Sequence, residues 1–460
     1  MRDAFILLML VFLFGAACKR PFLMTLAYLY VDLVQPQQIS YYLVNSVPIS
    51  LIFGAAAVAF FLFFDDKRDL SFGRVQALML LFLGWITITT FNAELGEQAW
   101  IKWDPAWKAI IFGVFLPFVL RTRQRIEAAV MFILLCVGSI TITGGIKTLA
   151  GGGGYGTMSL LVDSNNGLYE GSTISAVAVA LIPLILYAYS YNQIFPKRRI
   201  TLLLSAGLIF SAALIPIGTE ARTGLVCLAV LAIFLFLGAK RKLLFGAVGA
   251  VVAIASIPLL PDSFTGRMST IQTYDEDNSA STRVAVWNWT LDFVKDHPFG
   301  GGFYAYKLNR IEVQTRRRVG EGSNMREETV TVVDEARAFH SSYFEVLGEH
   351  GYPGLLIFMT MLVAALLQLR GLYRRFRTSD EDAWIAHLAK ALGQTTIIYM
   401  CGSLFVGVAF QSTLYFLLGL AAALAQIAAR RESATSRALL DLQGGSLKPQ
   451  AAAVAVVRPR

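Results

Sequence analysis

The sequence is poor in charged residues, and it has little cysteine. Only 15% of its 460 residues are charged, against roughly 25% in an average soluble domain, whereas 56% are apolar. A soluble chain of this length cannot bury that much apolar surface in one core. The four cysteines (Cys18, Cys136, Cys227 and Cys401) each lie in an apolar run, which is typical of small buried residues. These shortages exclude a soluble enzyme, a disordered chain and a disulfide-stabilised secreted domain.

Long apolar runs predict an all-α polytopic membrane protein. Thirteen runs are long enough, or nearly so, to cross about 30 Å of hydrocarbon. Each is expected to be helical, because lipid offers an open backbone no hydrogen-bonding partner. The first two runs are short, so we predict 12 or 13 transmembrane helices, and we interpret the first as a retained span rather than a cleaved signal. The runs are residues 4–18, 22–34, 46–64, 75–92, 109–120, 127–146, 171–192, 200–216, 223–238, 243–260, 353–370, 389–408 and 411–428.

The basic residues indicate which side of the membrane each loop faces. The net charge is +9, but 18 Lys and Arg lie in one set of short loops and 4 in the alternate set. By the positive-inside rule the first set and the C-terminus are cytoplasmic. The charge therefore reflects topology, and no nucleic acid is expected as a partner. The side of the N-terminus stays open, because it depends on whether both short runs cross.

One long polar loop divides the chain into four regions. We expect a transmembrane bundle at 1–260, a large periplasmic loop with catalytic helices at 261–352, further transmembrane helices at 353–428, and a disordered cytoplasmic tail at 429–460. Long loops are usually functional or disordered, and helical periodicity favours a folded loop here. Its pattern predicts one helix at 281–296, another at 336–349, and between them a β-hairpin or mobile flap with a charged tip at 316–328.

His340 is the histidine best placed for chemistry among the four in the chain. It lies near the start of the second expected loop helix, with Phe344 and Leu347 at helical spacing on its face. That position is over the outer end of the bundle. The unperturbed pKa of histidine suits a general base near neutral pH. The alternative is a half-buried histidine bonded to a nearby carbonyl.

Two arginines are the second indication of a functional site. Arg222 lies in a tight external turn, GTEART, and Arg283 lies in the first turn of the Trp-rich loop helix. Arginine forks bind phosphate oxygens bidentately, so both are candidates to bind a pyrophosphate. The alternatives are a snorkelling arginine paired with Glu220 and an arginine stacked on Trp287. Weaker candidates for substrate binding are Lys108, Asn165, Asn166, Arg267, Arg337 and Tyr343. The GGGGYG run at 151–156 lacks the ending of a phosphate-binding loop.

Three segments resemble the O-antigen ligase family of bacterial inner-membrane glycosyltransferases: FHSSYFEVLGEHGYPGLLIF at 339–358, HPFGGGF at 297–303 and DSNNGLYEGS at 163–172. The N-terminal MRDAFILL and QAWIKWDPAWKAI at 98–110 are similar to its exosortase-A-associated O-glycosylation ligase branch. The resemblance covers roughly residues 1–430. It implies about twelve helices and one large periplasmic loop, as in GT-C-like glycosyltransferases.

The resemblance also implies an activity in a Gram-negative inner membrane. A glycan would pass from undecaprenyl pyrophosphate to a hydroxyl acceptor on a protein, lipid or polysaccharide. Neither a metal nor a cofactor is implied. On the matching positions His340 is the catalytic histidine, and Arg222 and Arg283 are the pyrophosphate arginines. Ala221 departs from the serine that the family usually has before the turn arginine.

Two rival functions stay open at this stage. A polysaccharide polymerase of the same superfamily would use a second lipid-linked repeat as its acceptor. A lipid-linked glycan flippase or transporter is a different class, and it should show inverted repeats or charges at mid-membrane. No repeat is evident in the sequence, and Asp32 is the acidic residue that lies well inside a span. The large external loop favours an enzyme.

The loop at 261–352 provides a test of topology. A cysteine introduced by Ser323→Cys should react with an impermeant thiol reagent in intact cells whose outer membrane has been made permeable, because the loop faces the periplasm. The unsubstituted chain measures the background from its own cysteines. Labelling that begins only once the inner membrane is broken would contradict the topology.

Overall fold

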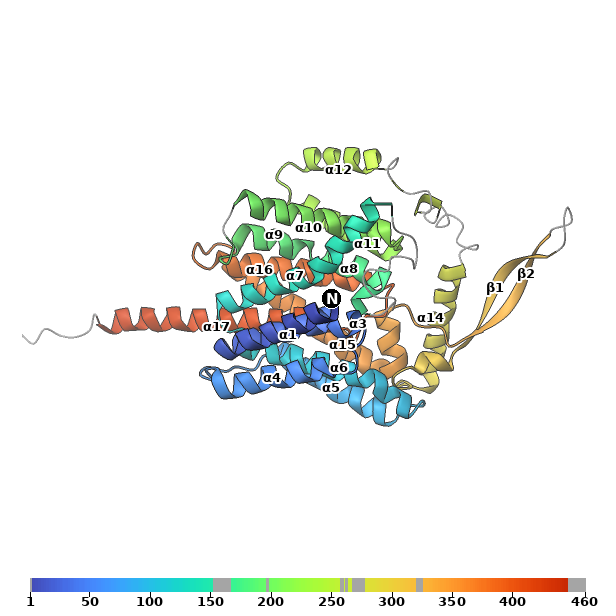
Figure 1. Ribbon diagram of the computed structural model, residues 1–460, viewed down its shortest axis with the longest axis horizontal. Helices are drawn as coiled ribbons and strands as arrows, with labels where there is room; N and C mark the ends of the chain where they lie inside the picture. The colour runs from blue at the N-terminus through green and yellow to red at the C-terminus, as the bar shows by residue number, and fades with distance from the viewer. Residues whose placement is uncertain are drawn as a thin grey trace, which may run out of the picture.

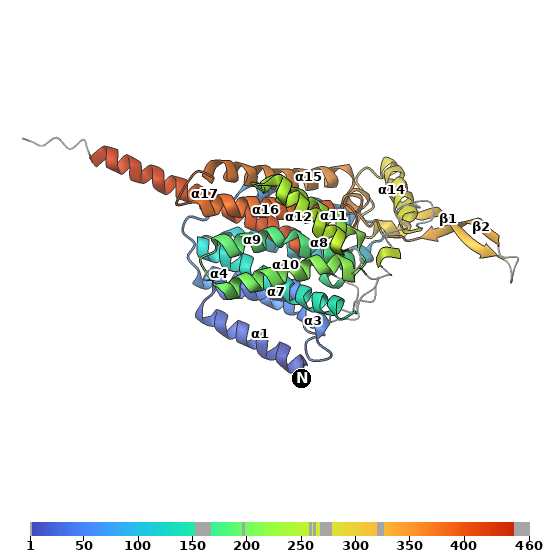
Figure 2. The same cartoon turned by 90° about the horizontal axis from the view of Figure 1, so that it is seen from above.

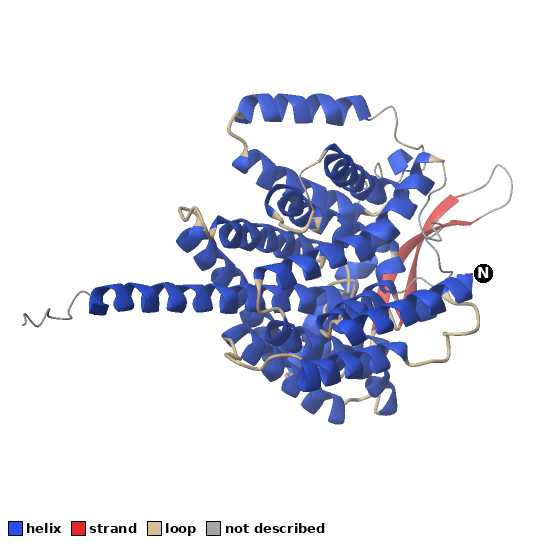
Figure 3. Cartoon of the chain, turned by 60° about the vertical axis from the view of Figure 1, so that its left-hand side comes forward, coloured by secondary structure: helices blue, strands red, loops and turns tan. Residues whose placement is uncertain are grey.

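The fold is helical almost throughout, with one β-hairpin (Figures 1 and 3). The computed structural model describes residues 2–151, 167–195, 198–256, 260, 264–266, 278–319 and 326–445. The helices are α1 (Arg2–Lys19), α2 (Phe22–Val34), α3 (Pro36–Ile39), α4 (Ile49–Phe64), α5 (Arg74–Phe91), α6 (Glu97–Val119), α7 (Arg123–Leu149), α8 (Gly171–Ala180), α9 (Ile182–Tyr191), α10 (Arg199–Gly218), α11 (Arg222–Gly238), α12 (Lys242–Ser256), α14 (Asn278–Asp296), α15 (Ser342–Phe376), α16 (Ala383–Gly402) and α17 (Ser412–Gly445). Strands β1 (Arg310–Val319) and β2 (Arg326–Glu335) pair antiparallel.

All thirteen apolar runs fall on helices, which confirms an all-α polytopic membrane protein. Within the described residues, six helices are long and apolar enough to cross a membrane, and α2, α4, α11 and α12 are shorter apolar helices. The run at 171–192 is interrupted at Leu181, where α9 begins with Pro183 in its first turn. Proline at that position removes no helical hydrogen bond, so the span continues after a small break. The six long helices are residues 74–91, 123–149, 171–191, 199–218, 342–376 and 412–434.

The helices form a bundle with two chemically different ends. At one end, which we term the basic end, Asp65 accepts from Arg121 at 3.5 Å and from Arg125 at 2.6 Å. Arg430 reaches the carbonyl of Arg121 at 3.1 Å there, and α17 extends beyond the bundle on this side (Figures 1 and 2). Helix α14 and the hairpin cover the opposite end, which we term the site end.

The N-terminal helix α1 starts at the site end, opposite the side from which α17 extends (Figure 1). Asp3 accepts hydrogen bonds from the backbone amides of Tyr41 and Tyr42 at 2.8 and 2.9 Å, which fixes the start of α1 beside the loop that follows α3. Lys19 at the other end of α1 lines a cavity with Arg125, at the basic end. Helix α1 therefore runs the length of the bundle, and α2 returns to the site end.

The polar loop is fixed to the bundle at a kink in α15. Gly351 has φ +65°, and a Cβ there would lie 2.1 Å from the carbonyl oxygen of Pro298. Nearby, the amide of Gly302 donates to the carbonyl of Glu349 at 2.8 Å. The HPFGGGF segment thus packs its backbone directly onto the kink. Glycine at 351 supplies both the left-handed conformation and the space.

Four expectations about the loop and the tail have different outcomes. The first loop helix is confirmed as α14. The hairpin is also confirmed, but the expected tip at 316–328 is too long, because residues 316–319 and 326–328 are paired within the strands. The second loop helix was expected at 336–349, and that start is wrong, because α15 begins only at Ser342 and then runs on through the kink. The tail expected to be disordered from 429 is helical as far as Gly445; its Ala, Leu and Arg are strong helix formers.

The kink predicts a contrast between two glycines of α15. Gly351→Ala should lower the melting temperature by several degrees, because the new Cβ clashes with Pro298 and the backbone is strained for any other residue. Gly371→Ala is the matched control, since no atom lies within 4 Å of its new Cβ and alanine favours a helix. Thermal unfolding in detergent measures both, and equal melting temperatures would contradict the role of the kink.

Candidate functional site

A polar cavity at the site end brings His340 and Arg283 together. The cavity has a volume of about 340 Å³, and we term it the histidine pocket. Its wall is assembled from α6, the first turn of α8, α14, the segment before α15, the first turns of α15, and the loop between α16 and α17. Its polar lining residues are Lys102, Glu170, Ser172, Thr173, Arg283, Tyr306, His340, Glu345 and Gln411.

His340 lies two residues before α15, in a strained backbone conformation. Its φ is +48°, a region that residues other than glycine rarely adopt and that is found at functional sites. Phe339 is buried beside it, and its carbonyl accepts from Trp287 Nε1 at 2.9 Å. The side chain of Asn309 binds the amide and the carbonyl of Arg337 at 2.9 and 2.6 Å. These bonds hold the segment so that the imidazole points into the pocket.

The charges around His340 favour a neutral ring. Loss of solvation and then the positive charge of Arg283 lower the pKa of His340 from its ordinary value, and Arg337 acts in the same direction. The carboxylate of Glu170 opposes them. An imidazole whose pKa is lowered stays unprotonated, and so able to accept a proton, at more acidic pH.

Arg283 reaches the pocket because α14 packs across the start of α15. One turn further along α14, Trp287 stacks on Phe344 with ring centroids 4.9 Å apart and planes 2° apart. Val286 is fully buried in a small core with Ile311 and Phe339. These contacts fix both the position and the rotation of α14, so the side chain of Arg283 is directed at the same cavity as His340.

Arg222 begins α11 at the same end of the bundle but does not line the histidine pocket. Its turn packs on α8: the hydroxyls of Ser175 and Thr219 are 2.7 Å apart, and a Cβ on Gly171 would lie 3.3 Å from Thr219. Glu170, the N-cap residue of α8, lines the pocket wall. The turn that carries Arg222 therefore packs on the helix that begins beside Glu170, and the role of Arg222 stays a prediction.

An ion cluster that the sequence did not predict lies beside His340. Lys102 Nζ contacts Glu345 Oε1 at 2.7 Å and both oxygens of Glu349 at 2.7 and 2.8 Å. The amide of Tyr304 donates to Glu349 at 3.0 Å, and the amide of Ala409 donates to Glu345 at 3.3 Å. The sequence offered one signal for it, two glutamates four residues apart on one helix face.

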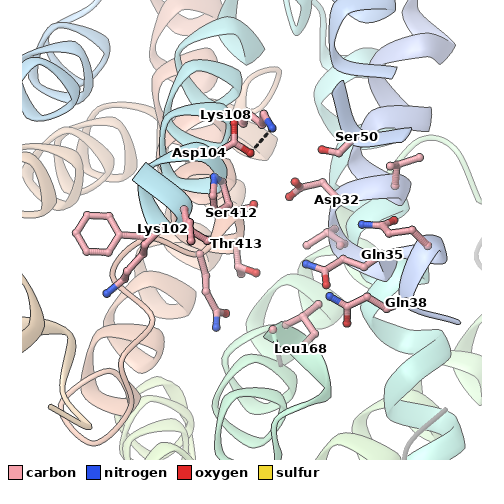
Figure 4. Close-up of a pocket in the computed structure, with 18 of the residues that line it drawn as sticks. Asp32, Gln35, Gln38, Ser50, Lys102, Asp104, Lys108, Leu168, Ser412 and Thr413 are labelled. Carbon is pink, nitrogen blue, oxygen red and sulfur yellow. Dashed lines mark hydrogen bonds and ion pairs between the residues drawn. The ribbon is translucent and has the colours of Figure 1, made fainter. Parts of the chain in front are cut away.

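A second cavity, of about 590 Å³, adjoins the first, and we term it the glutamine pocket (Figure 4). The two share the lining residues Lys102, Gly167, Glu345, Gly407 and Gln411. Lys108, a predicted substrate-binding residue, lines this second cavity and is paired with Asp104. The site end therefore holds two chambers that meet at the Lys102 cluster.

The other predicted residues are not gathered at the histidine pocket. Tyr343 donates its hydroxyl to the carbonyl of Met400 at 3.0 Å. Arg337 pairs with Asp334 at the surface. Arg267, Asn165 and Asn166 lie outside the described residues. In the part of the chain that the structure describes, no three His, Cys, Asp or Glu side chains are grouped to hold a metal ion.

Two other histidines have packing roles. His350 is fully buried: its Nδ1 lies 2.6 Å from Thr89 Oγ1, and its ring sits edge-on to Phe303. The ring of His297 stacks on Phe293 with centroids 4.2 Å apart, and it is partly exposed. Neither ring lines the histidine pocket.

The fold and the two pockets define a helical membrane protein with a polar site at one end of its bundle. Residues 206–359, which hold Arg222, Arg283 and His340, match the O-antigen ligase family. Residues 1–193 match a family of unknown function, DUF5935. No curated protein matches the chain. The family match identifies a membrane enzyme of the glycan ligase and polymerase type.

The Lys102 cluster predicts that losing the lysine destabilises the protein as long as the buried carboxylates remain. Lys102→Met should lower the free energy of unfolding by about 3–5 kcal/mol, because it leaves buried carboxylates without their cation; the Glu345 and Glu349 side chains are 11% and 0% exposed. Adding Glu349→Gln should recover part of the loss. Lys307→Met is the control, since Lys307 is exposed and bonds Gln98. Thermal unfolding measures all three variants. Lys102→Met alone being as stable as the parent would contradict the cluster's role.

Proposed function

We propose that this protein transfers a glycan from undecaprenyl pyrophosphate to a hydroxyl acceptor at the periplasmic face of a bacterial inner membrane. The observation that carries the proposal is a polar cavity lined by both His340 and Arg283. The site end would then face the periplasm and the basic end the cytoplasm, as the positive-inside rule requires. The polyprenyl tail would lie in the membrane among the helices.

In this mechanism His340 is the general base. Its neutral imidazole takes the proton of the acceptor hydroxyl as the oxygen attacks the anomeric carbon of the first sugar. The new glycosidic bond forms while the bond from that carbon to the pyrophosphate oxygen breaks, so the configuration inverts. The bonding pair leaves with undecaprenyl pyrophosphate, and the proton stays on the imidazole until solvent removes it.

The arginines would stabilise the leaving group. Negative charge grows on the pyrophosphate oxygens as the bond breaks, and cations fixed in advance at such a place are usually the largest catalytic contribution. Arg283 lines the pocket, and Arg222 would approach the same pyrophosphate from beside α8. Loss of one such group should raise the barrier by roughly 3–4 kcal/mol. Donor, acceptor and metal independence are all parts of this proposal.

His340→Ala should reduce transfer by about 10²–10⁴-fold, because the general base is lost. Expression should persist, and the lipid-linked donor should accumulate. His297→Ala is the control, since its ring stacks at the end of α14 outside the pocket. The assay is transfer from purified lipid-linked glycan by the purified chain, with and without EDTA. Parental transfer by His340→Ala would refute the mechanism.

The acid limb of the pH profile tests the charges around His340. A base works unprotonated, so transfer should fall as the pH drops through the pKa of His340. Arg283→Gln removes a charge that lowers this pKa and should move the limb to higher pH; Glu170→Gln should move it to lower pH. Arg283→Lys should slow transfer but leave the limb in place, since lysine keeps the charge and loses the bidentate fork. A limb unmoved by either glutamine variant would contradict the base assignment.

A further inference from the structure

The glutamine pocket contains buried acceptor atoms that the fold itself does not use. One carboxylate oxygen of Asp32 and the side-chain carbonyl oxygens of Gln35 and Gln37 are buried without a hydrogen-bond partner. All three residues line this cavity. Buried polar atoms are nearly always paired, and each exception requires an explanation. Three of them in one cavity make its wall a surface of acceptors, which suits a ligand rich in hydrogen-bond donors.

The wall that carries these oxygens is held rigidly. Gln35 joins α2 to α3 with φ +49°, a strained conformation for a residue other than glycine. Pro36 starts α3 directly after it, and Tyr169 donates its hydroxyl to the carbonyl of Val34 at 2.6 Å. The same wall is thus strained, fixed and rich in unused acceptors, a combination typical of a binding site.

The opposite wall comes from α6 and the start of α17. In Figure 4, Asp32 and Gln35 lie on one side of the cavity, while Ser412, Thr413 and the Lys108–Asp104 pair lie on the other. Hydroxyl groups can both donate and accept. The chamber therefore offers acceptors on one side and groups of mixed character on the other.

The chemistry and size of this chamber fit a glycan. Sugar hydroxyls are neutral donors, and carboxylate and amide oxygens accept hydrogen bonds from them. The bonds to a carboxylate are the stronger ones, because the acceptor is charged. A volume of about 590 Å³ lies within the usual range for organic ligands. Asp32 is the one carboxylate among the three residues that have an unpaired oxygen, and the chamber is larger than a bare cation needs.

We infer that the glutamine pocket binds the hydroxyl groups of a glycan whose reacting end lies in the histidine pocket. The inference rests on the proposed function, and it deepens it by assigning a part of the site to sugar recognition. Asp32, Gln35 and Gln37 belong to the segment that matches the family of unknown function. That segment would then select the sugar, while residues 206–359 carry the reaction.

The test uses the full chain in nanodiscs and three probes. These are undecaprenyl pyrophosphate, the lipid-linked glycan extracted from cells that lack this chain, and the free glycan released from it by mild acid. Asp32→Asn and Gln37→Leu should each weaken binding of the lipid-linked glycan at least tenfold and leave undecaprenyl pyrophosphate binding unchanged. Asp292→Asn, an exposed carboxylate of α14 outside both pockets, should change neither.

The arms separate the possible outcomes. If the pocket binds sugars of the acceptor, donor affinity stays constant and KM for the acceptor rises in the two pocket variants, which also supports a glycan site. Unchanged donor affinity together with unchanged acceptor KM would overturn the inference. A chain that fails to bind undecaprenyl pyrophosphate refutes the proposed function alone, because binding of the free glycan, and its loss in Asp32→Asn, still tests the pocket. Melting temperatures near that of the parent establish that both variants fold.

Discussion

The ion cluster centred on Lys102 is the interaction on which the site end depends. One ammonium group on α6 is shared by two carboxylates on successive turns of α15, and backbone amides from two further segments complete their hydrogen bonds. Burying three charges costs solvation that direct pairing alone barely recovers. Complete hydrogen bonding makes the arrangement tolerable, and it fixes α6, α15 and the loop after α16 in one relative position.

The cluster also joins the two halves of the sequence. Lys102 lies in the segment that matches the family of unknown function, and Glu345 and Glu349 lie in the segment that matches the O-antigen ligase family. The carboxylates are more than 240 residues from the lysine in the chain. The wall between the two pockets is therefore built from both segments. A reaction that uses both pockets would depend on both segments being in place.

Much of the fold was predictable, because hydrophobic length and periodicity are local properties. The thirteen apolar runs, helix α14 and the hairpin all follow from patterns within about twenty residues. The start of α15 was not predictable in this way. Ser342 Oγ donates to the carbonyl of Val406 and accepts from the amide of Val408, both at 2.9 Å, so contacts sixty residues away decide where the helix begins.

In the candidate site too, residues with an unusual local sequence were predictable, and residues whose partners are distant in the chain were not. His340 and Arg283 stood out as residues with unusual local settings, and the structure brings them to one cavity. Glu170 was not predicted as a site residue, because its sequence position is that of an ordinary helix N-cap. Its carboxylate does accept from the amides of Ser172 and Thr173, as an N-cap does. Lys102 lies among Trp100, Trp103 and Trp107 in the sequence, a pattern typical of an aromatic belt at the membrane interface, so its setting did not indicate a buried ion pair. Its partners are set by the packing of α6 on α15, which no single segment specifies.

The shared wall between the pockets has a thermodynamic consequence. Glu345 and Lys102 border both chambers, so a ligand that shifts either side chain in one chamber alters the surface presented to the other. Coupling of this kind is reciprocal: if occupancy of the first chamber changes affinity in the second by some factor, occupancy of the second changes affinity in the first by the same factor. Groups bound in the two chambers, whether they belong to one ligand or to two, would therefore bind with an energetic linkage whose size depends on how far the Lys102 ammonium group moves.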